Sequence, residues 1–208
     1  MKLPSTGVVE RLFFIIVDII ENIGLSGIFL LMVAESALIP IPSEVVMPFA
    51  GYLVANGEFT LLTVTLVGTI ANVVGSLLAY VVGVKGGRQL IEKYGKYILF
   101  TEGHLKLAEN LFERYGSFII LGGRLLPAVR TVISFPAGVG RMNKVKFTLY
   151  TFIGSFPWNF GLTLLGVVLE HRWEEITLLL SQFEVPLLVI GIILFLWFIK
   201  KGLDDDTR

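Results

Sequence analysis

The chain has 208 residues, of which 54% are hydrophobic and only 16% charged, and its formal net charge is zero. Soluble domains carry about a quarter charged residues, so this composition predicts an integral membrane protein, and the neutral balance argues against a nucleic-acid partner. Because the chain has no cysteine, and because His104 and His171 have no second ligand at metal spacing, we expect no disulfide, no metal site and no cofactor.

Residues 1–25 are predicted to hold an amphipathic helix. Val8 to Asn22 reads VVERLFFIIVDIIEN, and its apolar run is interrupted by Glu10, Arg11, Asp18 and Glu21. The stretch lacks the small-residue cleavage site of a signal peptide. We expect a helix that lies at the membrane interface, in preference to one that spans the bilayer.

Three apolar stretches are predicted to cross the membrane as helices. Phe59–Val84 and Phe147–Leu169 contain no charge and exceed the roughly 20 residues that a spanning helix needs. Residues 185–201 form a shorter C-terminal helix, which spans if the bilayer thins or flanking residues help. Small residues recur every four positions in the first of these helices and predict the close approach of another helix: Ala71, Gly75, Ala79 and Gly83.

Two further apolar regions, Ser26–Asn56 and Ser117–Gly140, contain prolines and charges that a simple spanning helix does not tolerate. Proline removes a backbone hydrogen bond, and broken backbone at membrane depth survives only where protein or a water-filled cavity covers it. We therefore predict two re-entrant hairpins, each made of a half-helix, a proline-marked turn and a second half-helix. The prolines expected to break them are Pro40, Pro42, Pro127 and Pro136.

Basic residues orient these elements, because cytoplasmic loops are enriched in lysine and arginine. The amphipathic linker 85–116 and the loop Arg141–Lys146 are both basic, whereas Glu170–Glu184 is acidic. If the linker, the loop and the C-terminus are cytoplasmic, the two hairpins enter from opposite faces. Units 26–84 and 117–170 then form an inverted repeat around a substrate site near the midplane. The predicted fold class is an all-α integral membrane protein built on this repeat, with one added C-terminal transmembrane helix.

Four ionisable side chains are predicted to lie within the membrane: Glu35, Glu44, Arg124 and Arg130. A charge at the bilayer centre costs at least ~2.5 kcal/mol, so we expect the acids of the first hairpin to pair with the arginines of the second or to line a cavity with them. The structural alternative is that ion pairs between these acids and arginines only hold the two hairpins together. Buried ion pairs, however, stabilise a protein little relative to apolar replacements.

These residue types also suggest a ligand. The planar guanidinium of arginine binds phosphate bidentately and stays charged when desolvated, so Arg124 and Arg130 are expected to bind a phosphate headgroup. Loss of water favours the neutral form of a carboxyl group, so Glu35 and Glu44 are expected to take up a coupling ion.

Three stretches together resemble the DedA family of bacterial membrane proteins, within the superfamily of SNARE-associated (VTT-domain) lipid flippases and scramblases. They read ESALIPIPSE from Glu35, GGRLLPAVRTVISFPAG from Gly122 and KFTLYTFIGSFPWN from Lys146, and the likeness covers roughly Gly24 to Trp173. The resemblance implies paired re-entrant hairpins and lipid transport driven by protons or sodium. It implies undecaprenyl phosphate or phosphatidylethanolamine as the substrate.

The resemblance also implies functional roles for the same four charged residues. Two membrane acids of the family fall on Glu35 and Glu44, and two arginines six residues apart fall on Arg124 and Arg130. Relatives with Pro-Gly-Asp at the second acid differ from this chain, which has Pro42-Ser43-Glu44. The ion-linked role is therefore assigned first to Glu35.

The leading hypothesis is a flippase or scramblase, not an enzyme, that moves undecaprenyl phosphate across the cytoplasmic (inner) membrane of a bacterium or archaeon. Two arginines suit a doubly charged phosphate monoester, which places this lipid ahead of phosphatidylethanolamine. A membrane-embedded lipid phosphatase would want a histidine or aspartate nucleophile, and the deep segments contain neither. A proton-coupled small-ion or osmolyte transporter leaves the paired arginines without an explanation. Membrane lipids and protons or sodium are the expected partners, and a homo-oligomer is left open.

Overall fold

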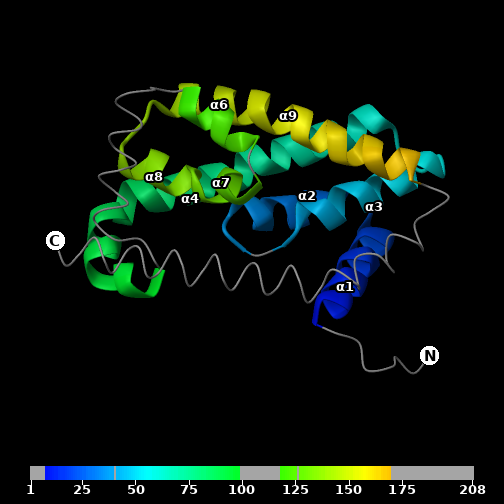
Figure 1. Cartoon of the computed structure of the whole chain (residues 1–208), viewed down its shortest axis with the longest axis horizontal. Helices are drawn as coiled ribbons and strands as arrows, with labels where there is room; N and C mark the ends of the chain where they lie inside the picture. The colour runs from blue at the N-terminus through cyan, green and yellow to red at the C-terminus, as the bar shows by residue number, and fades with distance from the viewer. Residues whose placement is uncertain (1–7, 40, 99–117, 126, 170–208) are drawn as a thin grey trace.

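The structure, a computed structural model, describes residues 8–39, 41–98, 118–125 and 127–169. Within these ranges every regular element is a helix (Figure 1), which confirms the all-helical prediction for the described part of the chain. Predictions for Pro40, for the linker beyond Ile98 and for the C-terminal helix at 185–201 lie outside the described residues. The helices are α1 (Val8–Ile23), α2 (Leu25–Ser36), α3 (Ser43–Ala55), α4 (Leu61–Ile98), α6 (Phe118–Arg124), α7 (Pro127–Val132), α8 (Ser134–Val139) and α9 (Lys144–Val168).

Two of these helices, α4 over Leu61–Gly86 and α9 over its whole length, are long and apolar enough to cross a membrane. They coincide with the predicted spans Phe59–Val84 and Phe147–Leu169. Helix α4 does not end with its apolar part, as predicted, but continues to Ile98. Leucine, glutamine, glutamate and lysine are good helix formers, so the polar end of α4 stays helical after the apolar pattern has stopped.

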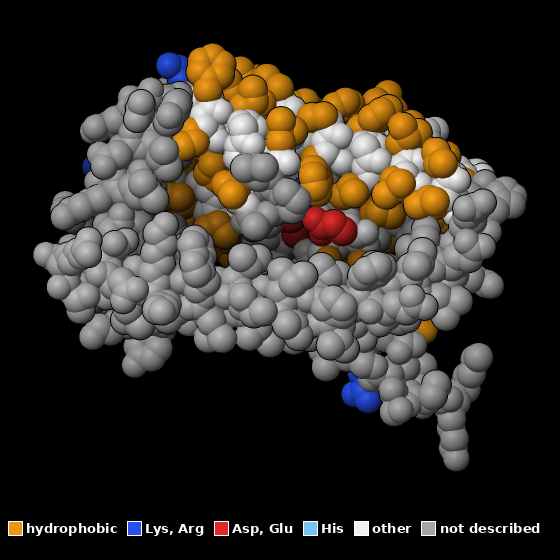
Figure 2. All heavy atoms as spheres, in the orientation of Figure 1, with side chains coloured by type: hydrophobic (Ala, Val, Ile, Leu, Met, Phe, Trp, Pro, Cys, Tyr) orange, Lys and Arg blue, Asp and Glu red, His pale blue; other side chains and the backbone are white. Residues whose placement is uncertain are grey.

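The described side chains are distributed as in a protein surrounded by lipid. Large hydrophobic side chains on α4 and α9, such as Leu62, Leu78, Leu149 and Leu165, are exposed, and Figure 2 shows hydrophobic side chains spread over this face. Acidic side chains are visible near the middle of this view (Figure 2). Polar side chains of the same two helices are buried instead, among them Thr69, Asn72, Ser76, Ser155 and Asn159. Soluble proteins show the opposite arrangement.

The short helices pack against the two long ones in a reciprocal pattern. In the first unit, α2 packs on α4, which follows it, and α3 packs on α9 of the second unit. In the second unit, α6 packs on α9, which follows it, and α8 packs on α4 of the first unit. Each unit therefore packs one short helix on its own long helix and one short helix on the long helix of the other unit.

Close helix crossings need glycine at the contact. A Cβ atom at Gly51 of α3 would overlap the carbonyl oxygen of Thr163 on α9, and a Cβ atom at Gly166 of α9 would overlap that of Pro48. Helices α4 and α8 make the same kind of contact. A Cβ atom at Gly83 of α4 would overlap the carbonyl oxygen of Phe135 on α8, and a Cβ atom at Gly138 of α8 would overlap that of Tyr80 on α4. Glycine at these positions allows the backbones to touch, so the small-residue stripe predicted on α4 does receive other helices.

The predicted breaks occur in both apolar regions, with one difference. In the first region, α2 ends at Ser36, Leu38 has a positive φ of 72°, and Pro42 is the N-cap of α3. Three short helices replace the two half-helices predicted for the second region. Pro127 begins α7, as expected for a proline at a helix start. Pro136 lies inside α8 and not at a turn between two half-helices. Because proline cannot donate a hydrogen bond to the carbonyl four residues earlier, at Val132, the helix is interrupted immediately after that residue.

Candidate functional site

The site is built around Glu35, in the last turn of α2. Its side chain is buried because α2 packs closely on α4, where a Cβ atom at Gly75 would overlap the carbonyl oxygen of Val33. The contact turns the C-terminal end of α2 toward the polar face of α4. A carboxylate in this position has to be satisfied by protein groups, since burial removes its water.

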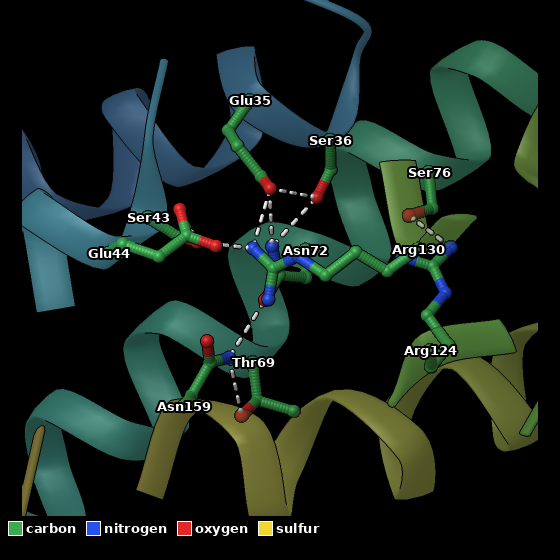
Figure 3. Close-up of polar contacts among 10 residues, drawn as sticks. All are labelled: Glu35, Ser36, Ser43, Glu44, Thr69, Asn72, Ser76, Arg124, Arg130 and Asn159. Carbon is green, nitrogen blue, oxygen red and sulfur yellow. Dashed lines mark hydrogen bonds and ion pairs between the residues drawn. The ribbon is translucent and has the colours of Figure 1, made fainter. Parts of the chain in front are cut away.

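Arg130 of α7 supplies the opposite charge. Its Nη2 lies 2.5 Å from Glu35 Oε1, and each of these side chains is only 5% exposed (Figure 3). The same nitrogen donates to Ser43 Oγ at 2.6 Å, at the start of α3. The guanidinium carbon also lies 5.0 Å from the centroid of the Trp158 ring on α9, within the range of a cation–π contact.

The second oxygen of Glu35 is held by two neutral donors. Ser36 Oγ donates to Glu35 Oε2 at 3.0 Å, and Asn72 Nδ2 of α4 donates to it at 3.1 Å. Asn72 Oδ1 accepts in turn from Asn159 Nδ2 of α9 at 2.7 Å, and Asn159 also donates to Thr69 Oγ1. A continuous chain of buried hydrogen bonds therefore joins the carboxylate to both long helices (Figure 3).

Arg124, at the end of α6, lies in a different environment. Its Nη2 donates to Ser76 Oγ of α4 and Ser134 Oγ of α8, both at 2.7 Å. Its side-chain stem lies against Gly154 of α9, where a larger residue would collide with it. Among the described residues no carboxylate pairs with Arg124, and its Nε has no hydrogen-bond partner. Within the described part of the chain, this buried guanidinium has only hydroxyl groups as hydrogen-bond partners.

Glu44 does not join the buried cluster. It is exposed in the first turn of α3 and accepts a hydrogen bond from Ser43 Oγ at 3.2 Å. Because Ser43 also accepts from Arg130, its hydroxyl connects Glu44 to that arginine without a direct ion pair. The expected pairing between acids and arginines is therefore present for Glu35 with Arg130, and absent in the described structure for Glu44 and for Arg124.

The buried charges do not balance. The charged residues that are buried in the described part are Glu35, Arg124 and Arg130, which leaves one positive charge in excess when all three are ionised. A buried charge is costly unless it is paired, so an anion would be favoured here. Within the described residues no group of three or more histidine or acidic side chains could hold a metal ion.

Several residues of the site were not singled out from the sequence. The two asparagines lie in spans that are otherwise apolar, and a polar side chain in such a span is a usable signal, because it has to find a partner inside the protein. The serine hydroxyls and the indole carried no such signal. The residues concerned are Ser43, Asn72, Ser76, Ser134, Trp158 and Asn159.

Comparisons with known proteins identify the family of the chain. A family model described as the VTT domain matches residues 41–168, more than half of the chain. An uncharacterized membrane protein, YkoX, of Bacillus subtilis is 37% identical over 92% of this chain and 85% of its own length. Undecaprenyl phosphate transporter A of Staphylococcus aureus is 34% identical over 93% of this chain and 98% of its own.

A third relative, named alkaline phosphatase-like protein, from Lactococcus lactis, is 32% identical over 90% of this chain and 92% of its own length. No solved structure matches the chain. The domain match and the extent of identity to these relatives show the family that the residue motifs suggested. The chain belongs to the VTT-domain family, the DedA family of membrane proteins.

Proposed function

We propose that this protein transports a phosphate-bearing lipid across a membrane and that the headgroup binds at Arg124 and Arg130. The observation that carries the proposal is Arg124, a buried guanidinium with hydroxyl partners and no carboxylate in the described structure. A phosphate oxygen could replace or join these hydroxyls, since arginine binds phosphate with parallel N–H donors. The acyl or prenyl tail would stay in the bilayer while the headgroup crosses.

Undecaprenyl phosphate is the preferred substrate. A phosphate monoester carries up to two negative charges, so it suits two guanidiniums better than the zwitterionic headgroup of phosphatidylethanolamine does. A relative with 34% identity is named as a transporter of this lipid phosphate. Phosphatidylethanolamine scrambling by the same site is the alternative within this class.

Glu35 gives the transporter a way to respond to an ion. While it is ionised, it occupies Arg130. Uptake of a proton would neutralise that partner and leave Arg130 available to phosphate beside Arg124, so headgroup binding and proton binding would favour each other. Sodium near the carboxylate could act in the same way. Glu44, which is exposed and connected through Ser43, would have the secondary role of delivering the ion.

The membrane arrangement that suits this function is an inverted repeat of two re-entrant hairpins in the cytoplasmic membrane, with the C-terminus in the cytoplasm. The reciprocal packing of α2, α3, α6 and α8 on the two long helices supports the repeat, because equivalent arms make equivalent contacts. The pair of matching glycine crossings supports it further. The excess positive charge would then lie at the junction of the two units.

Reconstitution into liposomes tests the proposal against its rivals. Vesicles would contain polyprenyl phosphate, phosphatidylethanolamine or a neutral lipid, each with a reporter, and translocation and phosphate release would be measured together. Translocation of the phosphate lipid without phosphate release is the expected result. Phosphate release would instead support a lipid phosphatase, for which the name of the Lactococcus relative is the one favouring observation. Transport of a small ion or osmolyte without any lipid movement would support the third class.

A further inference from the structure

The motif Gly154-Ser155-Phe156-Pro157-Trp158-Asn159 on α9 contains Trp158, which has no role in the proposed headgroup site of Arg124 and Arg130. Trp158 is half-buried, and its ring centroid lies 5.0 Å from the guanidinium carbon of Arg130. Its indole nitrogen Nε1 is buried and has no hydrogen-bond partner within the described part of the chain. Buried tryptophan N–H groups usually find an acceptor, so a donor left without one requires an explanation.

Two unpartnered N–H donors belong to residues of this cluster, within the described part of the chain. The buried nitrogen and oxygen atoms without a partner in the described structure are Arg124 Nε, Trp158 Nε1, Thr151 Oγ1 and Asn159 Oδ1. Both N–H groups belong to residues of the proposed headgroup site or in direct contact with it. Unused donors beside an excess of positive charge are complementary to a ligand with several acceptor oxygens.

We propose that Trp158 is a headgroup-binding residue, whose indole N–H donates to a phosphate oxygen beside Arg130. This inference rests on the proposed function, because it assigns a further residue to the same site. A phosphate bound at Arg130 would lie beside the indole, because the ring centroid is 5.0 Å from the guanidinium carbon. The indole adds a donor without adding charge.

The same contact explains how Arg130 remains available. A ring face against the guanidinium stabilises its charge without a second carboxylate, which would compete with phosphate. When Glu35 is neutral, the Arg130 guanidinium keeps the Trp158 face and the Ser43 hydroxyl. Trp158 would then hold Arg130 in position and contribute one hydrogen bond to the ligand.

Fluorescence gives a direct test, because the chain has three tryptophans and two of them can be removed. In a chain with Trp173→Phe and Trp197→Phe, Trp158 is the only indole. Its emission should change saturably when a polyprenyl monophosphate is added in detergent. Inorganic phosphate should produce the same change at higher concentration, because a phosphate oxygen is the proposed acceptor.

Trp158→Phe separates the hydrogen bond from the ring contact. Phenylalanine keeps an aromatic face for Arg130 but has no N–H, so binding of the polyprenyl monophosphate should weaken about tenfold, the loss expected for one hydrogen bond to a charged group. Phe160→Leu, an exposed aromatic substitution on the same helix, should bind like the parent chain.

The outcomes distinguish this inference from the proposed function. If calorimetry detects binding of the phosphate lipid while Trp158 emission stays constant and Trp158→Phe binds as tightly as the parent, the inference is wrong and the proposed function stands. If neither the parent nor any variant binds the phosphate lipid, the proposed function itself fails.

Discussion

Glu35 and Arg130 are 95 positions apart in the chain, and their side chains form an ion pair of 2.5 Å in which each is only 5% exposed. The pair joins α2 to α7, and so links the two predicted hairpins at a buried point. Neighbours hold both ends: Ser36 and Asn72 donate to the carboxylate, and Trp158 lies against the guanidinium. The other buried arginine, Arg124, lacks such a partner in the described structure.

Glu35→Gln should uncouple transport from the ion gradient. The amide mimics the protonated carboxyl, so Arg130 loses its charged partner permanently and the headgroup should still bind. Transport measured in proteoliposomes should continue down a lipid gradient and no longer respond to an imposed pH or sodium gradient. Glu58→Gln, at an exposed acid between α3 and α4, is the matched control and should keep the response. A full gradient response in Glu35→Gln would move the ion-linked role to Glu44 or elsewhere.

Removing the same carboxyl altogether should be costly for folding. Glu35→Ala leaves the Arg130 charge buried with only Ser43 and Trp158 as neighbours among its described contacts. The free energy of unfolding should fall by about 3–5 kcal/mol, as found when one partner of a buried pair is deleted. Thermal unfolding of the purified protein in detergent measures this, and a loss within experimental error would show that the ion pair is not formed.

Asn72 and Asn159 should be energetically coupled. Each asparagine contributes a buried hydrogen bond that the other completes, so Asn72→Ala alone should cost about 1–3 kcal/mol of stability. The double variant with Asn159→Ala should cost less than the sum of the two single variants, by roughly 0.5–3 kcal/mol. Asn143→Ala removes the N-cap of α9, far along the same helix, and should be additive with Asn72→Ala. Additivity of the two buried asparagines would contradict the network.

The glycine crossings should tolerate no side chain. Gly51→Ala places a Cβ atom against the backbone of α9, so the free energy of unfolding should fall by about 1–3 kcal/mol. Gly161→Ala on α9 itself meets nothing within 4 Å and should be neutral or stabilising by up to ~1 kcal/mol, because alanine favours a helix more than glycine does. Equal melting temperatures for the two variants would mean that α3 and α9 are not in direct contact.

Membrane orientation can be tested by cysteine labelling, since the chain contains no cysteine. Lys144→Cys at the start of α9 should be inaccessible to a membrane-impermeant thiol reagent in intact cells, and accessible after the cells are broken. Glu58→Cys, at the predicted outer end of the other long helix, should be labelled in intact cells. Labelling of Lys144→Cys from outside would contradict the predicted second hairpin and the basic loop on the cytoplasmic side.

The sequence predicted the long helices and the burial of Glu35, Arg124 and Arg130, but it did not predict that Glu44 is exposed or which side chains are in contact. Apolar length located the long helices, and proline together with buried charge located the broken regions. The choice of Glu35 over Glu44 as the partner of Arg130 depends on how α7 meets α2, which no local pattern encodes. Pro136 accompanies a helix break as predicted, but the break lies at Ile133, three residues before the proline, because the proline nitrogen cannot donate to the carbonyl of Val132.

The polar network was missed for a different reason. Asn72 and Asn159 lie within spans that were assessed by their apolar length, and their partners become apparent only when α4 and α9 pack together. The serine partners of Arg124 come from two different helices, so their convergence is a result of tertiary structure. Periodicity along one helix cannot predict such a meeting.

If Arg124 and Arg130 bind a phosphate headgroup, transport should depend on the planar guanidinium group, which Arg124→Lys removes. Lysine keeps the positive charge but has no planar pair of N–H donors, so bidentate binding of phosphate is lost while the buried charge remains. Arg141→Lys, at an exposed arginine beyond α8, is the matched control.

The decisive measurement is translocation of a polyprenyl monophosphate in proteoliposomes that contain equal amounts of folded parent, Arg124→Lys or Arg141→Lys protein. We predict that Arg124→Lys is slower by roughly ten- to a hundredfold, the equivalent of one or two charge-assisted hydrogen bonds, and that Arg141→Lys equals the parent. Parent-level translocation by Arg124→Lys, or by the double variant with Arg130→Lys, would contradict the phosphate site.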